Sequence, residues 1–145
     1  MKDPRGAVRL VEVGPRDGLQ NIRDHVPTPL KIELIRRLHR TGLRAIELTS
    51  VVSPRAVPQL ADCRDVLRND GIRYLQEQPL RLPVLVPNLK GLEVAMEHGA
   101  QEVAVFVSAS EGFSKANINC SVRQGIERAR AVAHRALQHG LTVRG

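Results

Sequence analysis

At 145 residues the chain is long enough for one domain, and its 22 basic and 15 acidic side chains give a formal net charge of +7. The 42% of hydrophobic residues is sufficient for a core, which excludes a disordered or low-complexity chain. The basic excess is spread evenly, with 13 basic and 9 acidic side chains in residues 1–72 and 9 and 6 in residues 73–145, and only three residues are aromatic. We therefore expect no nucleic-acid partner.

Short apolar runs rich in β-branched residues alternate with amphipathic stretches along the chain. The runs are typical of buried strands and the amphipathic stretches of helices, so the sequence predicts strands and helices in turn. In chain order we expect strand 7–13, helix 29–41, strand 44–50, helix 53–69, strand 82–86, helix 89–98, strand 102–107, helix 122–139 and the start of a fifth strand at 141–143.

Capping residues and glycines set the expected helix ends. Thr28 is a suitable N-cap for the first helix, and Ser121 with Gln124 forms a capping box for the last. Pro58 interrupts the second helix near its start, and Gly71 is expected to end it. Residues 72–81 are interpreted as a polar connection. Helices alternating with apolar strands predict an α/β fold with a parallel sheet covered by helices.

Polar side chains gather where the predicted strands end. The groups are Arg16 and Asp17 after the first strand, and then, along the chain, Glu47, Thr49, Ser50, Asn88, Ser108, Ser110 and Glu111. In parallel α/β folds the carboxyl edge of the sheet is where ligands bind. The sequence thus predicts a small-molecule site at this edge.

Four stretches, in order, resemble the hydroxymethylglutaryl-CoA lyase family. They are Val11-Glu12-Val13-Gly14-Pro15-Arg16-Asp17-Gly18-Leu19-Gln20-Asn21, then Ile46-Glu47-Leu48-Thr49-Ser50 followed by Val52-Ser53-Pro54, then Pro87-Asn88-Leu89-Lys90-Gly91, and Asn117-Ile118-Asn119-Cys120-Ser121. The resemblance covers about residues 8–145. It implies a TIM (β/α)₈ barrel, of which this chain would cover about the first four βα units as a single, incomplete barrel domain.

The same resemblance implies an activity and a cofactor. The family cleaves 3-hydroxy-3-methylglutaryl-CoA to acetyl-CoA and acetoacetate, a retro-Claisen reaction of leucine degradation and ketone-body formation, with a divalent metal, Mg²⁺ or Mn²⁺. The implied substrate is an acyl-CoA. With no targeting segment apparent, the cytoplasm is the expected location, or the mitochondrial matrix for a eukaryotic member. No apolar run approaches the ~20 residues of a membrane span, so no membrane partner is expected.

Six residues are the candidates for the site. By resemblance Asp17 is a metal ligand, and a carboxylate oxygen suits a hard cation. We expect Arg16 and Glu47 to be the catalytic residues and Arg16 also to bind substrate. Arg16 has a permanent charge and a planar fork, which suits an enolate or thioester oxygen, and the resemblance favours a Glu47 that pairs with Arg16 across adjacent strands. Asn117 resembles a substrate-contacting position in the loop before the last helix, and the alternative that it is only a turn residue is equally open. Gln20 and Ser50 are weaker candidates for substrate binding near the same rim.

Half a barrel leaves several hypotheses open. The chain could be the N-terminal part of such a lyase, inactive alone, or one subunit of a split barrel completed by a second copy or by another chain. It could also be a non-catalytic interaction module that keeps only the fold, or belong to another acyl-CoA or pyruvate lyase of the superfamily. Because open sheet edges expose apolar surface, we expect the isolated chain to dimerise or aggregate.

Overall fold

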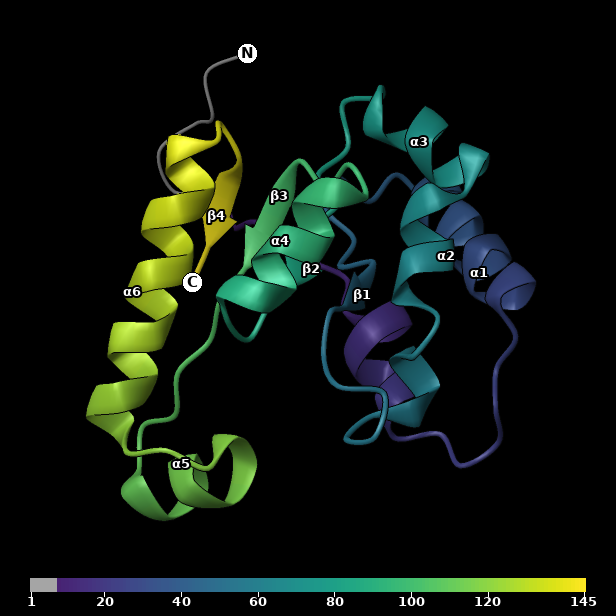
Figure 1. Cartoon of the computed structure of the whole chain (residues 1–145). Coiled ribbons are helices and arrows are strands. Elements are labelled where there is room, and N and C mark those ends of the chain that lie inside the picture. The colour runs from purple at the N-terminus through teal and green to yellow at the C-terminus, as the bar shows by residue number, and fades with distance from the viewer. Residues whose placement is uncertain (1–7) are drawn as a thin grey trace.

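The computed structural model describes residues 8–145, so Ala7 of the first predicted strand lies outside the described residues. Four strands form a parallel sheet in the order β1-β2-β3-β4 (Figure 1). Their bounds are β1 Thr49–Ser50, β2 Val84–Leu85, β3 Glu102–Ala104 and β4 Thr142–Arg144. The strands are shorter than the apolar runs that predicted them, but their order and parallel direction are those expected.

The first predicted strand joins this sheet through a single parallel bridge. Glu12 pairs with Ile46, and Ala45 in turn pairs with Arg81, ahead of β2. Residues 8–13 and 44–50 are therefore parallel neighbours, as the barrel interpretation requires. Val8 and Leu10 are exposed at this side of the sheet.

The helices pack on the strands through one hydrophobic core. Their bounds are α1 Thr28–Arg40, α2 Cys63–Arg68, α3 Asp70–Gln76, α4 Leu89–Glu97, α5 Glu111–Ile118 and α6 Val122–Gln138, with a π-helical turn η1 at Gly14–Gly18 and a 3₁₀ turn η2 at Pro58–Leu60. Buried side chains such as Ile35 of α1, Leu92 of α4 and Val132 of α6 meet Ile46 and Val84 in this core. Each buried aliphatic side chain of this size contributes roughly 1.5–3 kcal/mol.

Several predicted helix ends are confirmed. Gly42, Gly99 and Gly140 follow α1, α4 and α6 with φ of +90°, +81° and +77°, the left-handed conformation that glycine adopts without strain. Ser121 and Gln124 form the complete capping box of α6. These turns reverse the chain so that each helix returns toward the start of the next parallel strand.

Three local expectations in the middle of the chain are wrong. The single helix at 53–69 is instead the turn η2 followed by α2, and residues 72–81 are not merely a polar connection because α3 occupies 70–76. Gly71 lies inside α3 rather than ending a helix. The cause is a second cap: the Asn69 side chain accepts a hydrogen bond from Gly71 N (2.9 Å), and α3 then buries Ile72 and Leu75 in the core.

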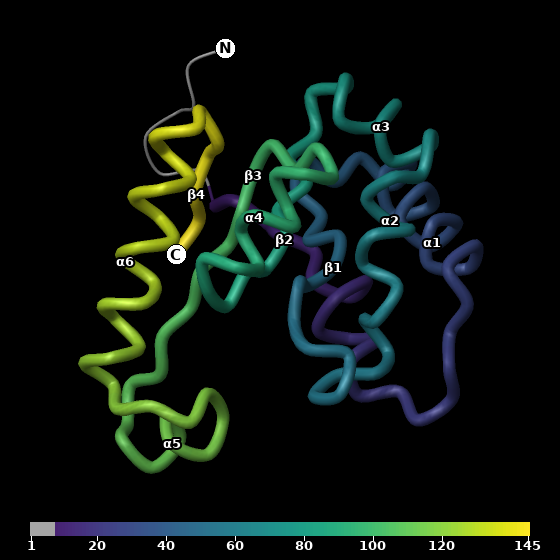
Figure 2. Tube along the Cα trace, in the orientation of Figure 1, coloured from purple at the N-terminus to yellow at the C-terminus, as the bar shows by residue number. Residues whose placement is uncertain are grey.

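Two further differences affect the site. The N-cap of α1 is Pro27, so Thr28 is the first helical residue and its hydroxyl is free to bind elsewhere. Residues 111–118 form α5, which the polar sequence did not predict; Ser110 caps it, and Asn119, with φ of +48°, ends it. The tube in Figure 2 shows α5 as an excursion between β3 and α6.

No helix in residues 8–145 is long and apolar enough to span a bilayer.

Candidate active site

The turn η1 holds Arg16 and Asp17 directly after the first strand segment. The backbone N–H groups of Asp17 and Gly18 both reach the carbonyl of Val13, at 2.7 and 3.3 Å. The Glu12 carboxylate accepts a hydrogen bond from Gly14 N at 2.6 Å, which fixes the start of the turn. The turn therefore sets Arg16 and Asp17 at the rim where the strands end.

Glu47 is the buried centre of the charged group. Its side chain is 0% exposed, and its Oε1 accepts a hydrogen bond from Arg16 Nε. Its Oε2 lies 3.0 Å from Nη1 of Arg144 as an ion pair, without the geometry of a hydrogen bond. A carboxylate removed from water in this way is stable only when paired, so Glu47 holds two guanidinium groups in place.

Arg144 is a member of this cluster that sequence reasoning missed. It lies in β4, whose residues pair with β3. The sequence did contain a signal for it. Residues 141–143 are expected to begin a fifth parallel strand, and the residue that follows them lies at the same rim as the ends of the neighbouring strands. Its charge also balances the cluster: two arginines face Glu47 and Asp17.

A cleft of about 660 Å³ opens beside this cluster. Five of the six candidate residues line it: Arg16, Asp17, Gln20, Ser50 and Asn117. Glu47 is not in the wall and lies behind Arg16. The Ser50 hydroxyl donates to the carbonyl of Leu85 at 3.1 Å, which ties β1 to β2 at the floor of the cleft.

The position of Asn117 corrects one expectation. It lies on α5 rather than in a loop, and α5 brings it into the same cleft as Arg16. Further lining residues were not singled out from the sequence: Phe106, Phe113 and Arg128. The lining of the cleft thus combines charged side chains of η1 with Phe106, which follows β3, Phe113 of α5 and Arg128 of α6. In Figure 1 α5 and α6 lie to the left of the purple turn η1.

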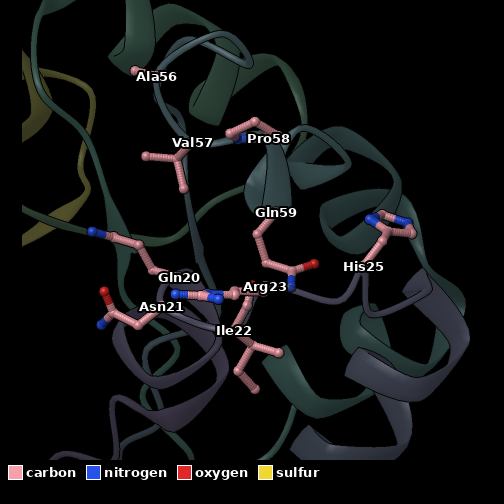
Figure 3. Close-up of a pocket in the computed structure, with 9 residues that line it drawn as sticks. All are labelled: Gln20, Asn21, Ile22, Arg23, His25, Ala56, Val57, Pro58 and Gln59. Carbon is pink, nitrogen blue, oxygen red and sulfur yellow. Dashed lines mark hydrogen bonds between the residues drawn. The ribbon is translucent and has the colours of Figure 1, made fainter.

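A smaller cleft of about 330 Å³ adjoins the first (Figure 3). The two share Gln20, Ala56 and Val57, so these residues form the wall between them. The smaller cleft is bounded on its other side by the loop that contains Arg23 and His25.

Asp17 is the residue that could offer an oxygen to a metal. Its side chain is 54% exposed, and one of its oxygens accepts a hydrogen bond from Arg16 Nη1 at 2.9 Å. Within residues 8–145, however, no three His, Cys, Asp or Glu side chains are grouped so as to hold a metal ion. The carboxylate oxygen of Asp17 suits a hard divalent cation, but the described residues do not form a complete coordination shell for one.

A second ion pair joins the strands far from this rim. Arg81, just before β2, binds Glu102 of β3 through two hydrogen bonds, one of them 3.0 Å from Nε to Oε2. The Glu102 carboxylate raises the pKa of the Arg81 guanidinium. This pair lies at the amino ends of the strands, where barrel residues serve stability rather than catalysis.

Comparison with known proteins places the chain in a family. The family model described as HMGL-like matches residues 7–145. The chain belongs to the HMGL-like family. Its α/β parallel sheet corresponds to the N-terminal part of this family's TIM barrel, and the fold class expected from the sequence is confirmed.

Two curated relatives are 54% identical over 138 residues, 95% of this chain. They are the mitochondrial hydroxymethylglutaryl-CoA lyase of Arabidopsis thaliana and the cytoplasmic 3-hydroxy-3-methylglutaryl-CoA lyase of Mus musculus, of which the match covers 29% and 39%. The chain therefore spans less than half the length of these HMGL-like relatives.

Solved structures of HMG-CoA lyases superpose on the chain. The Brucella melitensis enzyme is 52% identical with a TM-score of 0.84, and the match covers 95% of this chain and 48% of that one. An Acinetobacter baumannii enzyme, in complex with coenzyme A and 3-methylmalate, is 34% identical with a TM-score of 0.81, over 93% and 43%. The resemblance seen in the four sequence stretches is thus confirmed over nearly the whole chain.

Proposed function

We propose that this chain carries the Arg16–Asp17–Glu47 part of a lyase site that cleaves 3-hydroxy-3-methylglutaryl-CoA to acetyl-CoA and acetoacetate. The observation that supports this most strongly is the cleft that Arg16, Asp17 and Asn117 line together, with the Arg16 guanidinium paired with buried Glu47. The chain spans less than half of its relatives, so the remaining catalytic groups would come from residues outside this chain, and we expect it to be inactive alone.

The reaction needs two proton movements and one charge to be stabilised. The tertiary hydroxyl loses its proton, and the bond between the carbinol carbon and the methylene next to the thioester breaks. The electron pair passes to the thioester as an enolate, which then takes a proton to become acetyl-CoA. Negative charge therefore moves onto the thioester oxygen as the bond breaks.

Arg16 is suited to that developing charge. Its guanidinium stays protonated at every relevant pH, and the bond from Nε to Glu47 leaves its orientation fixed before substrate arrives. Arg144 holds Glu47 from the other side, so the carboxylate has little freedom to turn away. We assign Arg16 the enolate or thioester oxygen, with Glu47 and Arg144 as positioning residues.

Asp17 is assigned to a divalent cation, Mg²⁺ or Mn²⁺. A bound cation would supply Lewis-acid polarisation of the substrate oxygens. Asp17 provides one oxygen donor for it, and the other donors would lie outside residues 8–145. Gln20, Ser50 and Asn117 are assigned to substrate binding, with the acyl-CoA lying in the 660 Å³ cleft.

An NMR titration of the 145-residue chain tests the proposal without requiring turnover. Adding 3-hydroxy-3-methylglutaryl-CoA with Mg²⁺ should shift backbone amides of Arg16, Asp17 and Asn117, and Arg16→Gln should weaken the binding. As a matched control, Arg123→Gln alters an arginine paired with Glu127 on the exposed face of α6 and should leave binding unchanged. Shifts confined to residues outside the cleft would contradict the assignment.

A further inference from the structure

The segment 19–27, between η1 and α1, forms part of the wall of the proposed catalytic cleft. Gln20 lines both clefts, and the next residues line the smaller one (Figure 3). Leu19 and Gln20 continue the helical conformation of η1, whereas the loop 21–27 contains no helix and no strand. Its backbone polar groups therefore need partners from elsewhere to hold the wall in one position.

Gln59 supplies those partners from the turn η2. Its Nε2 donates to the carbonyls of Asp24, at 2.8 Å, and Ile22, at 3.2 Å. Its Oε1 accepts from the backbone N–H of Val26 at 2.9 Å. The residue is 6% exposed. One buried side-chain amide thus provides the hydrogen bonds that a neighbouring strand would otherwise provide. Both of its N–H donors and its oxygen acceptor bind the backbone of three residues of the loop.

Gln59 is itself held by a buried ion pair. Lys31 of α1 donates to the backbone carbonyl of Gln59 and to Oδ1 of Asp62, the latter at 2.7 Å. Thr28 donates to the other oxygen of Asp62 at 2.6 Å. Because Asp62 neutralises the buried ammonium of Lys31 and both groups are hydrogen-bonded, the network holds η2 firmly against α1.

We infer that Gln59 is a positioning residue of the cleft, which acts through the backbone of residues 22–26 to set Gln20 in the wall next to Arg16. Gln59 has no contact with the reacting centre and lies in the smaller cleft. Its effect is local, because its side-chain bonds end on one loop while the core is held by other residues. The effect of Gln59 on substrate binding rests on the proposed function, but the positioning of Gln20 by Gln59 does not.

The test uses the 145-residue chain with Gln59→Met, which keeps the length of the side chain and removes all three bonds. Gln59→Ala is the second variant. Gln76→Met is the matched control, since Gln76 donates one bond to the carbonyl of Gly99 away from the site. We expect amide hydrogen exchange at Val26 to accelerate at least about tenfold in both Gln59 variants, with exchange at Ile35 unchanged. The side-chain amide resonances of Gln20 should also shift.

Three results would overturn the inference. The first is unchanged amide exchange at Val26. The second is an acceleration at Ile35 equal to that at Val26, because this would indicate a general loss of stability. The third is a set of Gln20 side-chain resonances that shift no more than they do in Gln76→Met. A titration with 3-hydroxy-3-methylglutaryl-CoA and Mg²⁺ separates this from the proposed function. If the parent chain does not bind this substrate, the proposed function fails, while exchange at Val26 and the Gln20 resonances still decide the role of Gln59. If it binds, Gln59→Met should weaken binding about fivefold, and equal affinity would contradict positioning of the cleft.

Discussion

Replacing Glu47 with glutamine removes the one charge that holds two arginines at the rim of the sheet. Glu47 is 0% exposed, whereas the side chains of Arg16 and Arg144 remain 15% and 33% exposed. Removing one partner of a fully buried ion pair costs roughly 3–5 kcal/mol, because the other charge remains without a partner. Since both guanidinium groups keep some access to water and Arg16 keeps its pair with Asp17, we expect the lower end, a loss of about 3 kcal/mol in the free energy of unfolding.

Urea unfolding of the 145-residue chain, followed by circular dichroism, measures this loss. With a slope near 2 kcal/mol per molar urea, the midpoint should fall by about 1.5 M. The matched control is Glu33→Gln, which removes a carboxylate that pairs with Arg37 at 2.8 Å on the exposed face of α1. Its midpoint should stay close to that of the parent. Equal shifts in the two variants would refute the view that Glu47 is the buried centre of the cluster.

Three further outcomes are expected. In a complete lyase that contains these residues, Asp17→Asn should raise the metal concentration for half-maximal activity by at least about tenfold, and an unchanged metal requirement would remove Asp17 from the coordination shell. Burial raises the pKa of the Cys63 thiol in the folded chain. As pH increases, the thiol therefore ionises first in the unfolded chain, and the contribution of Cys63 to the free energy of unfolding should decline above about pH 8.5. Urea unfolding at pH 7 and pH 9.5 should show a smaller decline in Cys63→Ala, and identical declines would contradict the assignment. Glu102→Gln should destabilise the chain by about 1–2 kcal/mol in the same assay, because Arg81 loses its charged acceptor, and no change would show that this pair is only a surface contact.

The parallel arrangement could be predicted because it depends on signals that act locally. The parallel segment 44–50 is read from the hydrophobic pattern, and the structure pairs it at Ala45, Ile46 and β1, although as a strand it is shorter than predicted. Gly42, Gly99 and Gly140 are read from φ preferences and follow their helices as expected. The Arg16–Glu47 contact followed from the spacing of parallel neighbours, since charged groups at adjacent strand ends lie within reach of each other.

The misplaced elements share a different cause. α3 and α5 are short, with 7 and 8 residues, so an apolar face such as Ile72 and Leu75 of α3 does not repeat over enough turns to identify a helix. Asn69 and Ser110 cap them, and only the folded chain shows which of many similar polar residues act as caps. Arg144 was missed although the expected strand at 141–143 leads to it, because its pairing with Glu47, 97 residues away, depends on β4 joining the sheet. Gln59 could not be found because the backbone groups that it binds lie 33 or more residues away, in the loop before α1.

Turnover of Arg16→Gln in a complete lyase that contains these residues tests the central claim most directly. If the Arg16 guanidinium stabilises the charge that forms on the thioester oxygen, its loss should lower kcat by roughly 10²–10³-fold with little change in KM, because the contact strengthens in the transition state. The assay is acetoacetate release at saturating metal, with Arg123→Gln as the control for loss of an arginine on the exposed face of α6. Turnover near that of the parent enzyme would contradict the claim.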